Sequence, residues 1–89
     1  MTASSTPLPA ADCVLDTSGL VCPLPIIKTA DAMRTVPLGH VLQIISTDFG
    51  ILEDMPAWCT SLRQEFLGIR TEQLDDDRIV YHAFVRRQV

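Results

Sequence analysis

The sequence predicts an α+β fold, a two-layer α/β sandwich in which two helices cover one face of a four-stranded mixed sheet. Alternating apolar residues mark four short strands, and two stretches with helical spacing of apolar residues lie between the first three. The order along the chain is therefore βαβαββ. A strand, helix and strand in this order favour a right-handed crossover between parallel neighbours. The two layers bury one core between them.

Length and composition indicate one small domain. The chain has 89 residues, of which 47% are hydrophobic, and a net charge of −4. We expect a disordered leader over residues 1–10 and a single domain over 11–89. The absence of a secretory signal and of an apolar run of about 20 residues predicts a cytoplasmic protein without a membrane segment. Its scattered basic residues argue against direct nucleic-acid binding.

The first half of the chain is expected to form a strand, a helix and a second strand. The first strand covers residues 12–16, with Cys13 and Leu15 facing the core. The helix runs from about residue 23 to 35 and has an apolar stripe of Ile26, Ile27, Ala30 and Met33. A proline and a glycine then end it, and the second strand follows over residues 40–47.

The second half is expected to form a helix and a hairpin. Helical spacing covers about residues 51–66, with the stripe Met55, Trp58, Cys59, Leu62 and Phe66. Pro56 leaves two alternatives: a helix that begins there with Asp54 as its cap, or a longer, kinked helix. Strands over 67–74 and 78–86 follow, joined by the acidic turn 75–77.

The stretch richest in chemical information is Gly19-Leu20-Val21-Cys22-Pro23-Leu24-Pro25. Proline is tolerated in the first turn of a helix, so Pro23 is predicted to be the first helical residue and Cys22 its cap. The positive end of the helix dipole would then ease formation of the Cys22 thiolate, helped by the N–H groups of Leu24, Ile26 and Ile27.

Pro25 occupies the position that a second cysteine has in a C-x-x-C redox motif. A sulfane sulfur on Cys22 would find no neighbouring thiol in the motif to expel it. This arrangement suits a sulfur carrier better than a disulfide reductase. The alternative is a purely structural cysteine in front of a helix that begins with proline.

Asp48 is predicted to lie near Cys22. The carboxyl ends of parallel strands share one edge of a sheet, and Cys22 follows the first strand while Asp48 follows the second. Asp48 either caps the next helical turn or acts at the site, steering a partner or holding a proton near the sulfur. A close carboxylate would raise the thiol pKa and oppose the helix dipole, and the sequence leaves open which effect dominates.

The other potential ligands and thiols are expected to be structural. Cys13 and Cys59 lie on core-facing stripes, with the alternative that Cys59 is a second thiol that accepts or regulates sulfur. Trp58 is expected to anchor the core. His40 and His82 belong to no recognisable metal pattern, so we expect no metal and no cofactor.

The G-L-x-C-P-x-P string, Thr47-Asp48 and the stretch from Asp54 to Cys59 resemble the TusA/SirA/YedF-like sulfur carrier family. The resemblance implies the same βαβαββ fold, similar to the C-terminal domain of translation initiation factor 3. It also implies that Cys22 carries sulfur, supported by Pro23, Pro25 and Asp48. Phe49 departs from the family pattern, where a proline often follows this aspartate, and with its apolar neighbours it forms either a docking lip or part of the core.

The expected function is therefore that of a sulfurtransferase-type carrier, for which the label of enzyme is left open. A cysteine desulfurase or rhodanese-like donor would load Cys22 as a persulfide, and an acceptor protein would take the sulfur. The resemblance implies use in tRNA thiolation, molybdenum cofactor supply or sulfur oxidation, and we expect a monomer.

Two other functions remain open on the sequence. One is a regulatory or protein-interaction module whose Cys22 never carries sulfur. The other is a thiol-disulfide oxidoreductase that pairs Cys22 with Cys59 or Cys13, which requires Cα atoms within about 7 Å of each other.

Overall fold

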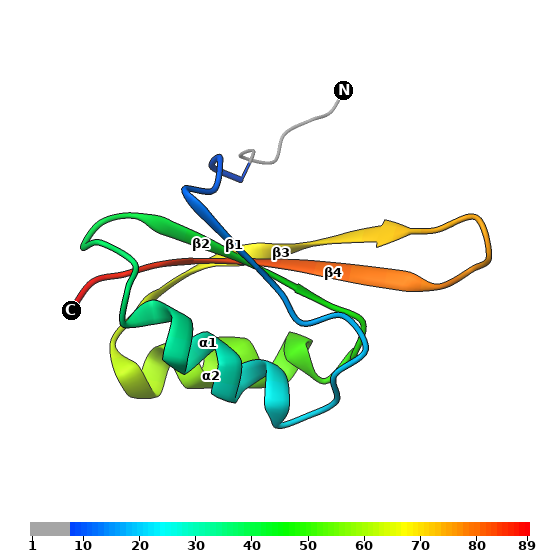
Figure 1. Ribbon diagram of the computed structural model, residues 1–89, viewed down its shortest axis with the longest axis horizontal. Coiled ribbons are helices and arrows are strands. Elements are labelled where there is room, and N and C mark those ends of the chain that lie inside the picture. Colours follow the sequence, from blue (N-terminus) through cyan, green and yellow to red (C-terminus); the bar gives the residue numbers. More distant parts are fainter. Residues whose placement is uncertain (1–7) are drawn as a thin grey trace.

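The computed structural model describes residues 8–89, so most of the expected leader, residues 1–7, lies outside the described part of the chain. The elements are β1 (Cys13–Asp16), α1 (Leu24–Met33), β2 (Val41–Ser46), α2 (Ile51–Leu62), β3 (Glu65–Gln73) and β4 (Ile79–Arg86). Both helices lie on the same side of the four-stranded sheet (Figure 1). The predicted two-layer βαβαββ fold is confirmed.

The strands lie in the order β1-β2-β4-β3. β1 and β2 are parallel, with Leu15 opposite Ile44, whereas β4 is antiparallel to both β2 and β3. The parallel pair is joined through α1, as predicted. Its carboxyl ends therefore meet at one edge of the sheet, and the loops that follow β1 and β2 lie next to each other.

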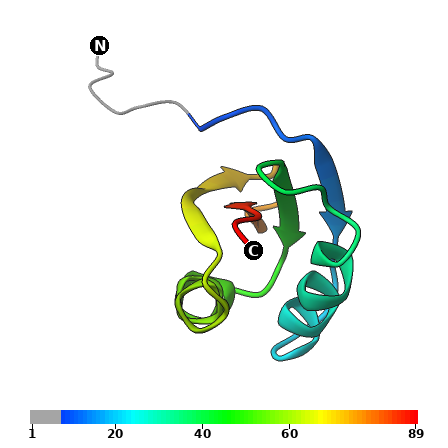
Figure 2. The ribbon, with the colours of Figure 1, turned by 90° about the vertical axis from the view of Figure 1, so that its left-hand side faces the viewer.

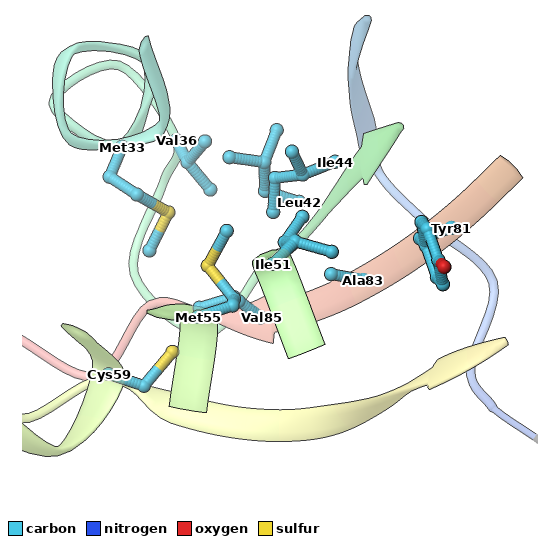
Figure 3. Close-up of a cluster of buried hydrophobic side chains, with 10 residues drawn as sticks. All are labelled: Met33, Val36, Leu42, Ile44, Ile51, Met55, Cys59, Tyr81, Ala83 and Val85. Atoms are coloured by element: carbon cyan, nitrogen blue, oxygen red, sulfur yellow. The ribbon is translucent and has the colours of Figure 1, made fainter. Parts of the chain in front are cut away.

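The helices and the sheet form two separate layers (Figure 2), and buried side chains fill the space between them (Figure 3). Ile44 of β2 and Met55 of α2 are fully enclosed. The period-2 alternation of the strands supplies the sheet side of this core, and the i, i+4 spacing of α2, together with the carboxyl end of α1, supplies the helix side. The buried cluster consists of Met33, Val36, Leu42, Ile44, Ile51, Met55, Cys59, Tyr81, Ala83 and Val85.

The apolar stripe predicted for α1 is wrong in part. The buried row is Pro25, Thr29 and Met33, while Ile27 is 55% exposed. Thr29 tolerates burial because its hydroxyl donates a hydrogen bond to the Pro25 carbonyl oxygen at 2.8 Å. The helix thus packs along an i, i+4 row that begins at the second proline of the motif.

The α2 helix begins at Ile51, as expected, but ends at Leu62 rather than at Phe66. Arg63 adopts a left-handed conformation with φ of 62°, and the Gln64 N–H donates to the Cys59 carbonyl oxygen, which terminates the helix. Phe66 belongs to β3 instead. Pro56 lies inside the helix, so the longer-helix alternative is the one observed, and Gly50 rather than Asp54 is the N-cap.

The face of the sheet opposite the helices is approached by the beginning of the described chain (Figure 1). Leu8, within the expected leader, lies so close to Gly68 of β3 that a Cβ there would be 3.0 Å from the Leu8 Cδ2 atom. Gly68 has φ of +140° and follows a register irregularity between Phe66 and Gly68. Of the two helices within residues 8–89, neither has the length and apolar character needed to cross a membrane.

Candidate functional site

Cys22 lies in the loop between β1 and α1, and this loop is attached to the end of β2. The Ser18 N–H donates to the Asp16 Oδ1 atom at 2.9 Å, which turns the chain after β1. The Gly19 N–H donates to the Thr47 Oγ1 atom at 2.8 Å. These bonds hold the loop against the β2–α2 turn and leave Cys22 exposed.

Asp48 contacts the main chain of Cys22. The Cys22 N–H donates to the Asp48 Oδ2 atom at 2.8 Å, and the Asp48 N–H donates to the Oγ atom of buried Ser46 at 3.1 Å. The predicted proximity of Asp48 and Cys22 is therefore confirmed. It follows from the parallel crossover, which brings together two residues 26 positions apart in the sequence.

Asp54 contacts the sulfur itself. The Cys22 thiol donates a hydrogen bond to the Asp54 Oδ2 atom at 2.9 Å. Asp54 lies in the first turn of α2, shortly after Asp48 in the sequence. Because the loops after β1 and β2 meet at one edge of the sheet, this turn of α2 also lies close to Cys22. From the sequence, Asp54 is expected only as a helix cap, and its contact with the thiol is not predicted.

The electrostatic environment of Cys22 opposes ionisation. The hydrogen bond to Asp54, reinforced by partial desolvation and by the negative charges of Asp54 and Asp48, raises the pKa of the Cys22 thiol above its ordinary value. The expectation that the helix dipole would ease thiolate formation is thus wrong. The carboxylates dominate because Asp54 contacts the sulfur directly.

The amino end of α1 also differs from the prediction. Pro23 is the N-cap and Leu24 the first helical residue, so Cys22 precedes the cap. The Leu24 N–H donates to the Val21 carbonyl oxygen, and the N–H groups of Ile26 and Ile27 both donate to that of Pro23. These three donors are already satisfied within the chain, which is why they do not serve the sulfur. Pro25 is buried in the second position of the helix.

The structure does not bring the other cysteines to the site. Cys59 is 1% exposed in the core, where burial raises the pKa of its thiol to about 11. Cys13 packs against the core from β1, and all three cysteines are free. The contrast between an exposed Cys22 and an enclosed Cys59 argues against a redox pair formed by these two thiols.

Large apolar side chains are exposed around the site. Phe49, which follows Asp48, is 72% exposed, and Leu52 is 47% exposed, whereas Ile51 between them is buried in the core. Val21 and Leu24 flank Cys22 on its own loop and are exposed as well. The apolar corner that the sequence predicts is therefore divided between a surface lip and the core.

Neither histidine lies at this site. His82 is 8% exposed in β4, with its ring nitrogens 2.8 Å from the Gln43 Nε2 atom and 2.9 Å from the Glu72 Oε1 atom. His40 is on the surface, with its Nδ1 atom 3.8 Å from the Asp12 Oδ2 atom. Within residues 8–89, no group of three or more His, Cys, Asp or Glu side chains is arranged to hold a metal ion.

Comparison with known proteins identifies the family. The family model described as Sulfurtransferase TusA matches residues 14–86, which include the whole site. This chain belongs to the TusA family. A relative, YrkI of Bacillus subtilis, is 39% identical over 70 residues, covering 79% of this chain and 88% of its own length. The sulfur carrier protein TusA of Pseudomonas syringae pv. tomato is 33% identical, with 79% and 80% of the two chains covered.

Some relatives are much longer than this TusA-family chain. YrkF of Bacillus subtilis is 45% identical over 62 residues, which are 70% of this chain but only 34% of YrkF. Among solved structures, a SirA-like protein from Desulfitobacterium hafniense has the same fold, with a TM-score of 0.64 at 15% identity. The match covers 86% of this chain and 99% of that protein.

Proposed function

We propose that this chain is a sulfur carrier that accepts a sulfane sulfur on Cys22 as a persulfide and passes it to an acceptor protein. The observation that supports this most is a free, exposed cysteine that is held by two hydrogen bonds in the loop after β1. The other two thiols lie in the core or pack against it. Relatives of this family named as sulfur carrier proteins support the same role.

The transfer needs no oxidant. A donor persulfide, R–S–S⁻, and the Cys22 thiol exchange to give Cys22–S–S⁻ and R–SH. The sulfur–sulfur bond to the donor breaks, a new one to Cys22 Sγ forms, and the thiol proton ends on the released donor thiol. Because the thiolate is the attacking form, the raised pKa of the Cys22 thiol disfavours attack by the empty carrier.

The surroundings of Cys22 suit protein partners on both sides of the relay. Phe49 and Leu52 offer exposed apolar area on the segment that carries Asp48 and Asp54, and these two aspartates offer negative charge. A cysteine desulfurase or a rhodanese-like protein fits as the donor class. We extend the proposal to a cytoplasmic monomer that serves tRNA thiolation, molybdenum cofactor supply or sulfur oxidation.

The test is intact-mass analysis after incubation with a sulfane donor. We expect the wild-type protein to gain the mass of one sulfur atom and to lose it on treatment with dithiothreitol. Fragmentation of the tryptic peptide 1–28, which holds both Cys13 and Cys22, should place the added sulfur on Cys22. Cys22→Ser should gain none, and Cys59→Ser serves as the matched control that still loads.

Loading of Cys22→Ser, or no loading of the wild type, would overturn the proposal. In the second case, the alternative of an interaction module gains support, and it predicts that Cys22→Ser keeps partner binding unchanged. A thiol-disulfide oxidoreductase would instead need an intramolecular disulfide, which the enclosed position of Cys59 disfavours.

A further inference from the structure

Two carboxylates hold Cys22, and they hold different parts of it. Asp48 Oδ2 accepts from the main-chain N–H at 2.8 Å, and Asp54 Oδ2 accepts from the side-chain thiol at 2.9 Å. The first bond is independent of the chemical state of the sulfur. The second exists only while the sulfur carries a proton.

A persulfide on Cys22 removes the donor from this second bond. The inner sulfur, Sγ, is then bonded to Cβ and to the outer sulfur and carries no hydrogen. Only its lone pairs face the Asp54 carboxylate. The outer sulfur carries a negative charge at neutral pH, and both aspartates repel it. An attractive contact in the empty protein thus becomes a repulsive one in the loaded protein.

We propose that Asp54 is a positioning residue that distinguishes empty from sulfur-loaded Cys22, stabilising the thiol and so favouring delivery of the sulfur to an acceptor. The inference rests on the proposed function, because it concerns the loaded state. Asp54 lies outside the motif formed by Cys22 and its two prolines, and its contact with the thiol would favour one direction of sulfur transfer.

The role follows from the exchange equilibrium between Cys22–SH with R–S–S⁻ and Cys22–S–S⁻ with R–SH. The thiol proton of Cys22 ends on R–SH, so the protons balance within the exchange itself. A group that binds one side of an equilibrium more tightly shifts the equilibrium toward that side. Since Asp54 accepts a hydrogen bond only from the empty form, it shifts the exchange toward release.

The upward shift of the Cys22 thiol pKa agrees with this role. The groups that act on the Cys22 thiol from the packed elements are Asp54 of α2 and Asp48 of the β2–α2 turn, and the bond to Asp54 is the largest cause of the raised pKa. The same contact that disfavours loss of the proton to solvent also disfavours its replacement by sulfur.

The chain offers a matched control in Glu53. It lies next to Asp54 in the first turn of α2 and is exposed, so Glu53→Gln removes the same charge from the same helix end. Asp54→Asn removes the charged acceptor from the sulfur at nearly constant size. Circular dichroism of both variants verifies that the fold is kept, and Asp54→Ala provides a second variant that removes the acceptor entirely.

The first measurement is the loaded fraction at equilibrium with a fixed ratio of glutathione persulfide to glutathione. We expect Asp54→Asn to raise the ratio of loaded to empty protein by about threefold or more, and Asp54→Ala at least as much, since charged hydrogen bonds exceed neutral ones in strength. Glu53→Gln should remain close to the wild type.

The second measurement is the rate of Cys22 alkylation by iodoacetamide as a function of pH. In Asp54→Asn the rate should rise at a lower pH than in the wild type, because the thiolate no longer meets the carboxylate. Glu53→Gln should follow the wild-type curve. A merely structural role of Asp54 would leave this profile unchanged.

The outcomes separate the two proposals. If the wild type takes up no sulfur, the proposed function fails and this inference fails with it. If the wild type loads and Asp54→Asn matches Glu53→Gln in the loaded fraction or in the alkylation profile, the inference alone is overturned.

Discussion

The Cys22 N–H donates to the Asp48 Oδ2 atom at 2.8 Å, which ties the loop after β1 to the turn after β2. Asp48 Oδ1 also accepts a longer bond of 3.4 Å from the Gly50 N–H at the beginning of α2. One carboxylate therefore links the segment that carries the sulfur to the helix that carries Asp54. The geometry of the Asp54 contact depends on this link.

Asp48→Ala should loosen the segment that carries Cys22. It removes the acceptor for the Cys22 N–H, and we expect a loss of about 1 kcal/mol in the free energy of unfolding. Asp48→Asn is the control, because its side-chain carbonyl still accepts a hydrogen bond. Urea unfolding and amide hydrogen exchange measured by NMR test this. Equal exchange rates of the Cys22 amide in the wild type and Asp48→Ala would contradict the prediction.

Cys59 should make the protein lose stability at alkaline pH. Its thiol ionises with an ordinary pKa of 9.0 in the unfolded chain and of about 11 in the folded one. Between these values the folded state binds more protons, so the free energy of unfolding falls as pH rises. The contribution is complete below pH 9 and is lost as pH rises through about 11, a change of about 3 kcal/mol.

The measurement is urea unfolding of the wild type and Cys59→Ala at neutral pH and at successive points up to pH 11. Cys59→Ala should be less stable at neutral pH, because it leaves a gap in the core. The difference between the two proteins should shrink as pH rises, since the variant lacks the thiol. A constant difference over this range would show that the buried thiol does not resist ionisation.

Gly68→Ala should destabilise the sheet in two separable ways. The φ of +140° is rarely adopted by residues with a side chain, and the added Cβ would lie 3.0 Å from the Leu8 Cδ2 atom. We expect a loss of about 1–3 kcal/mol from such strain. In the background of Leu8→Ala, the steric part should disappear and the backbone part remain. Thermal unfolding of the four proteins measures both, and an equal cost in both backgrounds would rule out the contact with Leu8.

The order of the elements and the meeting of Cys22 with Asp48 could be predicted from the sequence. Both follow from short-range patterns: period-2 and helical spacing of apolar residues predict the elements, and a strand-helix-strand unit has a preferred handedness. The ends of the elements and the buried face of α1 were harder to predict from the sequence. They depend on the left-handed Arg63 and on the internal hydrogen bond of Thr29, which only packing against the sheet selects.

The contact between Asp54 and the Cys22 sulfur depends on the packing of α2 and could not be predicted from the sequence. The side chain of Asp54 reaches Cys22 because Ile51, Met55 and Cys59 of the same helix are buried in the core and thereby set the rotation of α2. A helix dipole is a local property that can be inferred from a motif, whereas a carboxylate 32 residues away acts through space. Here the distant carboxylate outweighs the local dipole, and it raises the pKa of the Cys22 thiol.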